Sequence, residues 1–232
     1  MATRPHHAGE RGETSDAVEN YAKAIYALQQ RGGPVTTNAL AERLGVTAAS
    51  ASAMVKRLDE RGLVRHVRYK GVELTDTGER LALEVLRHHR LLELYLAESL
   101  GMPWDRVHEE AERLEHVISE ELEDLISAQL GDPTHDPHGD PIPTRDGRID
   151  ESPSEMLQSL EPGQAGTFVR VSDADPEMLR YLAERGIAPG DRFEVVDKQP
   201  FDGPVFARFG DEVQVLGGIL ARAMRVEVSR SP

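Results

Sequence analysis

Apolar residues recur at helical spacing through the first third of the chain and predict three helices. A stripe that begins at Val18 predicts a helix over residues 16–30. Threonine residues that can cap helices precede two shorter ones, expected over 39–44 and 48–61. The short turn between these two contains glycine, which is typical of a helix–turn–helix.

Residues 63–74 alternate between apolar and polar side chains, as in a β-hairpin. Lys70 and Gly71 predict the tight turn of this hairpin. A basic hairpin directly after the second helix of a helix–turn–helix is a wing. We therefore expect a winged helix-turn-helix in the N-terminal part of the chain.

Leucine-rich patterns predict three more helices, over residues 79–100, 104–115 and 120–130. Exposed apolar stripes on helices beside a DNA-binding unit usually bury against a second copy of the chain. We therefore expect a homodimer.

Beyond these helices the pattern changes to loop and strand. Residues 132–153 are rich in Pro, Gly and Asp and predict a loop. The strand candidates that follow are 167–171, 192–196, 205–209, 212–215 and 223–228, with one helix over 176–185. Five short strands fit an SH3-like barrel. The predicted fold class is mainly α with a β-rich C-terminal module.

Composition limits the function classes. The 232 residues include no cysteine, which excludes disulfides, thiolate metal sites and cysteine nucleophiles. No apolar run approaches the roughly 20 residues that a membrane span needs. Residues 1–14 are polar, lack the apolar segment of a signal peptide, and are expected to form a disordered tail. We expect a cytoplasmic protein with no membrane partner.

The net charge of −14 hides a local excess of positive charge. Residues 47–70 carry six Lys and Arg residues against Asp59 and Glu60, and six minus two gives +4. A basic patch on an acidic body allows contact with phosphates at one face. The excess of carboxylates elsewhere suits a protein that binds cations, although acidity is equally typical of a protein that is merely soluble.

The start of the second helix of a helix–turn–helix meets base edges in the major groove. Here that end carries short side chains that permit close approach, and basic residues follow it. The candidate contacts to double-stranded operator DNA are Thr37, Thr47, Ala49, Ser50, Ser52, Lys56, Arg57, Arg68 and Lys70. The alternative is a three-helix packing unit without DNA, which the basic wing argues against.

Histidines and glutamates at helical spacing are the most specific pattern in the chain. They are His89 and Glu93 on one predicted helix, and His108, Glu112, Glu115 and His116 on the next. On a continuous helix the last four fall within roughly a 100° arc. Imidazoles and carboxylates on one face form a divalent-metal surface. The alternative is a solvated acidic face, because the surrounding segment is rich in glutamate.

An enzyme is the competing class, since a carboxylate–histidine metal site could activate water. However, the sequence contains no His-Glu-x-x-His, no glycine-rich phosphate loop and no Gly-x-Ser-x-Gly motif. We therefore expect a protein that is not an enzyme.

Motifs along nearly the whole chain resemble those of the diphtheria-toxin-repressor family of metal-dependent transcriptional regulators. The carriers are Glu19-Asn20-Tyr21, Ala41-Glu42-Arg43-Leu44, Leu58-Asp59-Glu60-Arg61-Gly62-Leu63, Leu74-Thr75-Asp76-Thr77-Gly78, His89-Arg90-Leu91-Leu92-Glu93, the segment 108–116, and Gly139-Asp140-Pro141-Ile142-Pro143. The resemblance implies a DNA-binding repressor of metal-homeostasis genes, with two metal sites in each subunit.

The resemblance also implies how the ligands are divided. A primary site would use Asn20, Glu112, Glu115 and His116. An ancillary site would use His89, Glu93 and His108 with ligands from the C-terminal module, where Asp173 and Asp175 are the candidates. These two aspartates could instead cap the helix that follows them.

The donor atoms favour one metal over another. The iron branch of the family has sulfur-bearing residues at the positions of Asn20 and Glu112, whereas this chain offers only oxygen and nitrogen. Hard ligands suit Mn(II), so we expect Mn(II), with Fe(II) as the alternative. A further alternative is a winged-helix regulator whose metals are purely structural.

The expected domains follow from the patterns and the resemblance together. They are a tail at 1–14, a winged helix-turn-helix DNA-binding domain at 15–75, a helical metal-binding and dimerisation domain at 76–143, a linker at 144–157, and an SH3-like domain of the FeoA type at 158–232.

Overall fold

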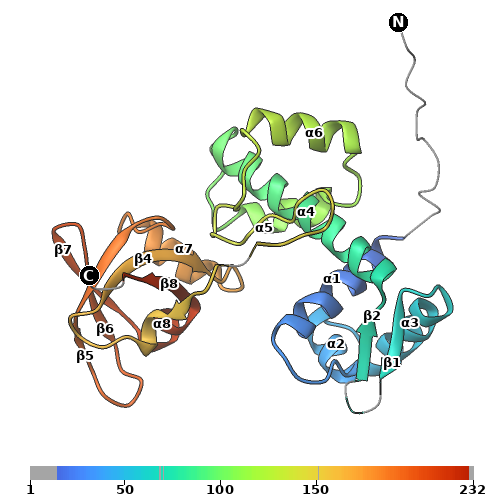
Figure 1. Ribbon diagram of the computed structural model, residues 1–232, viewed down its shortest axis with the longest axis horizontal. Helices are drawn as coiled ribbons and strands as arrows, with labels where there is room; N and C mark the ends of the chain where they lie inside the picture. Colours follow the sequence, from blue (N-terminus) through green and yellow to red (C-terminus); the bar gives the residue numbers. More distant parts are fainter. Residues whose placement is uncertain (1–14, 68, 70, 151, 230–232) are drawn as a thin grey trace, which may run out of the picture. The chain divides into compact units, whose positions relative to one another are not determined.

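The computed structural model describes residues 15–67, 69, 71–150 and 152–229 (Figure 1). The predicted tail at 1–14 and the candidate DNA contacts Arg68 and Lys70 lie outside the described residues. The chain divides into two compact units, Met1–Val85 and Leu86–Pro232. The mainly α fold with a β-rich C-terminal module is confirmed.

The first unit is a winged helix. Its helices are α1 (Asp16–Gln30), α2 (Thr37–Leu44) and α3 (Ala48–Glu60), and its hairpin pairs β1 (Val64–Val67) with β2 (Gly71–Leu74). Helix α1 has the predicted bounds. Helix α2 begins two residues earlier than expected, because Thr36 is its N-cap and accepts a hydrogen bond from the Ala39 N–H.

An apolar core joins the three helices to the hairpin. Ile25, Leu40 and Leu58 are fully buried in it, and Val72 brings β2 against the same cluster. Strand β2 of the hairpin lies beside Val35, whose carbonyl accepts a hydrogen bond from the Val72 N–H at 2.9 Å. Gly71 has a φ of +77°, and a Cβ there would lie 2.2 Å from the Val35 carbonyl oxygen. Only glycine fits at this start of the second strand.

Helix α4 (Asp76–Glu98) contains the division between the units, and its second half belongs to the second unit. It begins three residues before the predicted start because the Thr75 hydroxyl accepts from the Gly78 N–H. Helices α5 (Val107–Leu114) and α6 (Glu120–Gln129) follow. The buried residues Leu91, Ala111 and Ile126 pack these helices together.

Helix α5 begins at Val107 rather than at Trp104. Residues 104–106 form a turn instead, in which the Arg106 N–H donates to the Pro103 carbonyl. Trp104 packs against the core of the C-terminal module, and its indole N–H donates to the Leu179 carbonyl at 3.1 Å. Tertiary packing of this tryptophan therefore replaces the predicted first turn of the helix.

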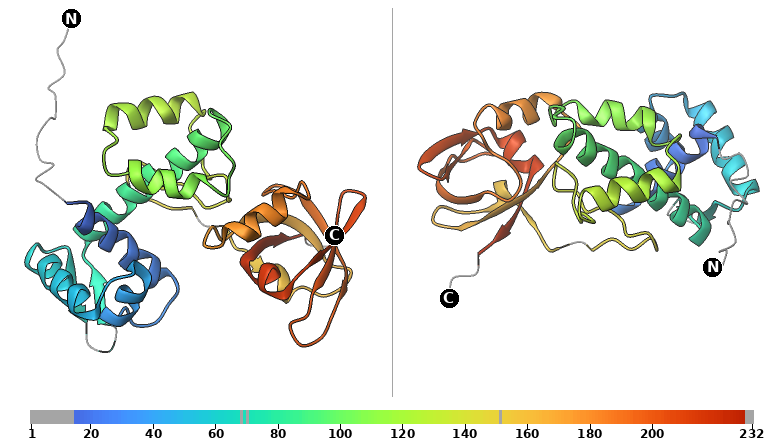
Figure 2. Two further views of the ribbon diagram at one scale, coloured as in Figure 1. Left: turned by 180° about the vertical axis from the view of Figure 1, so that it is seen from behind. Right: turned by 90° about the horizontal axis from the view of Figure 1, so that it is seen from above.

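Residues 130–154 form a loop that includes the predicted loop at 132–153, without a helix or strand in the part described. The C-terminal module contains β3 (Glu155–Met156), a 3₁₀ turn (Leu157–Ser159), β4 (Ala165–Val171), α7 (Pro176–Ala183), β5 (Arg192–Lys198), β6 (Val205–Phe209), β7 (Glu212–Leu216), α8 (Gly218–Ala223) and β8 (Met224–Val228). Figure 2 shows the strongly curved sheet of this module from two further sides.

The sheet is antiparallel, with the strand order β3-β8-β4-β5-β6-β7. The prediction of five strands omitted β3, which has two residues and is too short to show an alternating pattern. It also omitted α8, a helix of six residues. Phe168, Val195 and Leu216 are fully buried within the curve of the sheet.

Candidate metal centre and DNA-binding surface

Helix α4 presents His89 and Glu93 one turn apart, and α5 presents His108 opposite them. The side chains of His89 and Glu93 are 6% and 2% exposed. His89 Nε2 lies 3.0 Å from Glu93 Oε1, and His108 Nδ1 lies 3.1 Å from the same oxygen. Asp173, which follows β4, reaches this group with its Oδ2 2.9 Å from His108 Nδ1.

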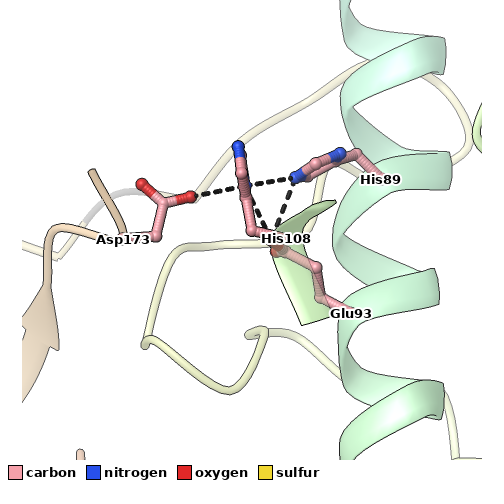
Figure 3. A group of neighbouring side chains, drawn as sticks. All are labelled: His89, Glu93, His108 and Asp173. Atoms are coloured by element: carbon pink, nitrogen blue, oxygen red, sulfur yellow. Dashed lines mark hydrogen bonds and ion pairs between the residues drawn. The ribbon is translucent and has the colours of Figure 1, made fainter. Parts of the chain in front are cut away.

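Figure 3 shows these four side chains pointing toward one another, from α4, from α5 and from the C-terminal module. One donor atom from each lies within 4.8 Å of the others. The structure therefore brings together four of the five residues predicted for the ancillary site. The fifth, Asp175, is the N-cap of α7, where its Oδ1 accepts from the Glu177 N–H at 2.9 Å. Asp175 therefore has the capping role that the sequence offered as its alternative, and it is not part of the candidate site.

The charges of this group depend on one another. Burial opposes ionisation of Glu93, yet the neighbouring His89 and His108 hold the pKa of Glu93 below its usual range. Hydrogen bonds with Asp173 and Glu93 raise the pKa of His108 to about 10. Two partly desolvated carboxylates thus attract positive charge strongly at one point, and a divalent cation could replace the proton that His108 holds there.

A second group lies on the other side of His89. Donor atoms of His89, Glu112 and Glu115 lie within 4.8 Å of one another. Glu115 is fully buried, and its Oε2 lies 2.5 Å from His89 Nδ1. The His116 ring lies beside it, with Nε2 3.4 Å from Glu115 Oε1. Glu115 therefore lies beside two other residues predicted for the primary site, Glu112 and His116, and His89 contacts both groups.

The helical face that the sequence predicted for these residues is interrupted. Helix α5 ends at Leu114, Glu115 is its C-cap, and His116 lies in the following turn. Ser119 then caps α6 by accepting from the Leu122 N–H. The break places Glu115 in the interior, whereas Glu112 on the preceding turn is 38% exposed. Asn20, the fourth predicted residue, lies on α1 in the first unit.

Two residues of the segment predicted as a loop also face Glu93. Asp136 and His138 are 7% and 0% exposed, and each offers a donor atom within 4.8 Å of a Glu93 oxygen. His138 Nε2 donates to the Trp104 carbonyl at 2.8 Å, so in the neutral ring Nδ1 is the nitrogen with the lone pair. This Nδ1 is buried, lies 3.9 Å from Glu93 Oε2, and has no hydrogen-bond partner within the part of the chain that is described.

Such an orphaned imidazole nitrogen beside a carboxylate fits a cation better than a hydrogen-bond network, because buried polar atoms are normally satisfied. The signal in the sequence was a histidine between two aspartates in Asp136-Pro137-His138-Gly139-Asp140. All donors in these groups are nitrogen or oxygen, and nitrogen–oxygen sets with carboxylates suit first-row divalent cations.

A buried network of charged side chains lies next to Glu115. Glu123 on α6 is 2% exposed, accepts from Arg87 Nε at 2.5 Å, and lies 3.1 Å from His88 Nε2. The other ring nitrogen of His88 lies 3.2 Å from the Glu115 carbonyl. Burial alone would raise the pKa of Glu123, but the hydrogen bonds from His88 and Arg87 lower it to about 2. The sequence pattern does not single out Glu123, because exposed glutamates surround it.

The candidate DNA-binding surface lies on the first unit. Thr47 is the N-cap of α3, and its hydroxyl accepts from the Ser50 N–H at 3.1 Å. On α3 the buried Ala51, Val55 and Leu58 face the core. The predicted DNA contacts on this helix are exposed, namely Ala49, Ser50, Ser52, Lys56 and Arg57, while Thr37 is half-buried at the start of α2. The geometry therefore leaves the predicted reading face of α3 open.

Three family models match the chain. The model described as the iron dependent repressor N-terminal DNA binding domain matches residues 13–72. The iron dependent repressor metal binding and dimerisation domain matches residues 75–144, and the FeoA domain matches residues 156–228.

Relatives match over most of their length. The iron-dependent repressor IdeR of Mycobacterium tuberculosis is 32% identical over 227 residues, covering 93% of this chain and 98% of that protein. The diphtheria toxin repressor of Corynebacterium diphtheriae is 30% identical over 226 residues, covering 91% and 97%. A solved structure of a manganese-dependent transcriptional repressor in complex with manganese is 42% identical, covers 91% of this chain and all of that one, and superposes with a TM-score of 0.86. With this agreement in sequence, domain order and fold, the chain belongs to the iron-dependent (diphtheria toxin) repressor family, whose members are metal-dependent transcriptional repressors that bind DNA and are not enzymes.

Proposed function

We propose that this protein is a Mn(II)-sensing repressor of metal-homeostasis genes that acts in the cytoplasm on operator DNA. The observation that carries the choice of metal is the donor chemistry, because no sulfur atom belongs to either candidate group. Hard oxygen donors with imidazole suit Mn(II). The similarity to a manganese-dependent repressor agrees with this proposal. Fe(II) is the second candidate, favoured by the similarity to IdeR.

The two groups support two cation sites in each subunit. The first would be held by Glu112, Glu115 and His116 from the second unit, with Asn20 from the first. The second would be held by His89, Glu93, His108 and Asp173. Two further donors lie beside Glu93, namely the carboxylate of Asp136 and the Nδ1 of His138, which has no hydrogen-bond partner among the described residues.

The response to metal follows from which residues share a cation. Asn20 belongs to the first, DNA-binding unit. The other proposed ligands of the first site belong to the helical part of the second unit. A cation held by both sets of ligands would couple the DNA-binding unit to the helical part of the second unit. Two copies of α3 in a dimer then match half-sites about one helical turn of DNA apart. Metal and DNA each raise the affinity of the protein for the other by the same factor.

Exposed apolar residues on the helical part support the homodimer. Leu122 and Leu125 on α6 are 48% and 62% exposed, and Val117 before α6 is 75% exposed. Apolar side chains this exposed on neighbouring turns are typical of a self-complementary interface. The same region matches the family's dimerisation domain.

Among the helices of the described residues, not one combines the length and the apolar character that crossing a bilayer requires.

The proposal is tested by capture of genomic DNA fragments with the purified full-length protein, in parallel with Mn²⁺, with Fe²⁺ under anaerobic conditions, and with a chelator. We expect enrichment of the same fragments with Mn²⁺ and none with the chelator. Equal enrichment with the chelator would contradict metal sensing and indicate structural metals. Enrichment at a far lower free concentration of Fe²⁺ than of Mn²⁺ would replace manganese by iron.

Variants then test the ligand assignment on the recovered operator. Glu112→Gln should weaken Mn²⁺-dependent DNA binding by about 5–150-fold, the usual range of an allosteric coupling. Glu109→Gln is the matched control, because Glu109 lies exposed on the same helix outside both groups. Unchanged operator affinity of Glu112→Gln at limiting Mn²⁺ would remove Glu112 from the site.

A further inference from the structure

The loop between α6 and the C-terminal module holds a carboxylate that two arginines share. Asp140 Oδ1 lies 3.3 Å from Nη2 of Arg90 on α4 and 3.3 Å from Nη1 of Arg170 on β4. Arg90 also donates to the carbonyl of Pro141. The Asp140 N–H donates to Asp136 Oδ1 at 2.9 Å, and this hydrogen bond fixes the backbone that carries the Asp140 carboxylate. Arg90 is 15% and Arg170 is 30% exposed, so these charge-assisted contacts are partly shielded from water.

The backbone of the same loop lies directly against β4. The Val171 N–H donates to the His138 carbonyl at 2.9 Å. A Cβ at Gly139 would lie 1.9 Å from the Val169 carbonyl oxygen, and the φ of Gly139 is +85°. Loop and strand therefore approach as closely as a missing side chain allows. Any shift of β4 along the loop would break these contacts.

This contact matters because β4 leads into Asp173. Asp173 follows Arg170 by three residues and Val171 by two, and its Oδ2 lies 2.9 Å from His108 Nδ1. In the group His89, Glu93, His108 and Asp173, only Asp173 comes from the C-terminal module. The position of its carboxylate therefore depends on how the end of β4 is fixed against the helical part.

We propose that Arg90, Asp140 and Arg170 form a clamp that positions Asp173 for the second cation site. The inference rests on the proposed function, because it takes Asp173 as a ligand. None of the three clamp residues belongs to that four-residue group, so their role is positioning. A ligand carboxylate that is already held in place loses little freedom on binding, and the affinity of the site rises accordingly.

The clamp is tested with Arg170→Gln in the full-length protein, by titration with Mn²⁺ followed by electron paramagnetic resonance. We expect the second site to bind Mn²⁺ about tenfold more weakly, while the affinity of the first site stays at its wild-type value. Arg170→Lys keeps the charge and should restore part of the affinity. Arg208→Gln is the matched control, because Arg208 lies on β6 and pairs with Glu194 on β5 at 3.8 Å, within the module.

A double-mutant cycle separates positioning from a general loss of stability. If Arg170 acts through Asp173, Arg170→Gln should cause no further loss of Mn²⁺ affinity in the Asp173→Asn background. Losses that multiply, or wild-type affinity at both sites in Arg170→Gln, would overturn the clamp. If Asp173→Asn alone leaves both affinities unchanged, the ligand assignment in the proposed function fails instead, and the clamp with it.

Discussion

The winged helix and the helical part of the second unit place their polar side chains in opposite ways. Among residues 15–85, where the structure describes them, the buried side chains are apolar or aromatic, and no charged side chain is buried. Between residues 86 and 143 the interior holds ionisable side chains, namely His88, His89, Glu93, Glu115, Glu123, Asp136 and His138.

The difference follows from what each region must bind. Phosphates and base edges are reached from the surface, so the winged helix exposes its polar residues and keeps an ordinary apolar core. A cation needs donors that are already oriented and partly stripped of water, so the helical part buries them. Burying charge is unfavourable unless the charges are paired. The ion pairs around the metal centre are therefore needed for the fold as well as for function.

The largest effect is expected from Glu123→Gln, which leaves Arg87 and His88 without their shared buried carboxylate. Loss of one member of a buried ion pair costs about 3–5 kcal/mol of stability. Trp104 is the single tryptophan and lies in the second unit, so its fluorescence during urea unfolding reports on that unit.

Glu121→Gln is the control for this prediction, since Glu121 is exposed and lies two residues before Glu123 on the same helix, α6. It should change stability by no more than about 0.5 kcal/mol. Equal unfolding midpoints for the two variants would break the comparison between the regions.

Acid should weaken the second unit before the first. The pKa of Glu123 falls from 4.5 to about 2 on folding, so its contribution is complete above pH 4.5 and is lost as the pH falls toward 2. A shift of this size corresponds to about 3 kcal/mol. Trp104 fluorescence in chelator should show this loss, and Glu123→Gln should flatten it. An identical acid profile in the variant would assign the acid sensitivity to other carboxylates.

In the winged helix a cap should matter more than any charge. Thr47→Ala removes the acceptor for the Ser50 N–H and should cost about 1 kcal/mol. The loss should appear in unfolding followed by circular dichroism, while the Trp104 fluorescence transition in the second unit stays in place. If the fluorescence midpoint moves equally, the two units unfold together.

The smallest effect on stability is expected from Lys56→Ala. Lys56 pairs with Glu60 at 3.7 Å, but both side chains are well exposed, and such helical pairs contribute about 0.3–0.5 kcal/mol. DNA binding should respond more: loss of one phosphate contact reduces the salt dependence of operator affinity by about one counterion. An unchanged salt dependence would remove Lys56 from the DNA surface.

Most of the fold could be predicted from periodicity, caps and turns, because α1, the hairpin and the five longer strands of the module depend on local patterns. The failures have tertiary causes. Trp104 packs on the module and shortens α5, and β3 and α8 are too short to carry a period of their own. Local sequence contains no information about these contacts.

For the candidate site, four-residue spacing found His89, Glu93, His108 and Glu112. It missed Asp136 and His138, because a segment rich in Pro, Gly and Asp reads as a linker unless its tertiary contacts are known. It also could not show that Asp173 reaches His108 while Asp175 caps a helix, since both are aspartates two residues apart. Side-chain direction decides between them.

The imidazole of His89 has one further consequence, for the shape of the gene response. Its Nε2 faces Glu93, a proposed ligand of the second site, and its Nδ1 faces Glu115, a proposed ligand of the first, so one ring contacts ligands of both sites. On the proposed assignment His89 binds the second cation directly and contacts the first site through Glu115, so filling either site would restrict the ring and leave less disorder to remove when the other site fills. Transcription should then fall over a narrower window of free Mn²⁺ than two independent sites would give, and a cell would experience the regulator as a threshold.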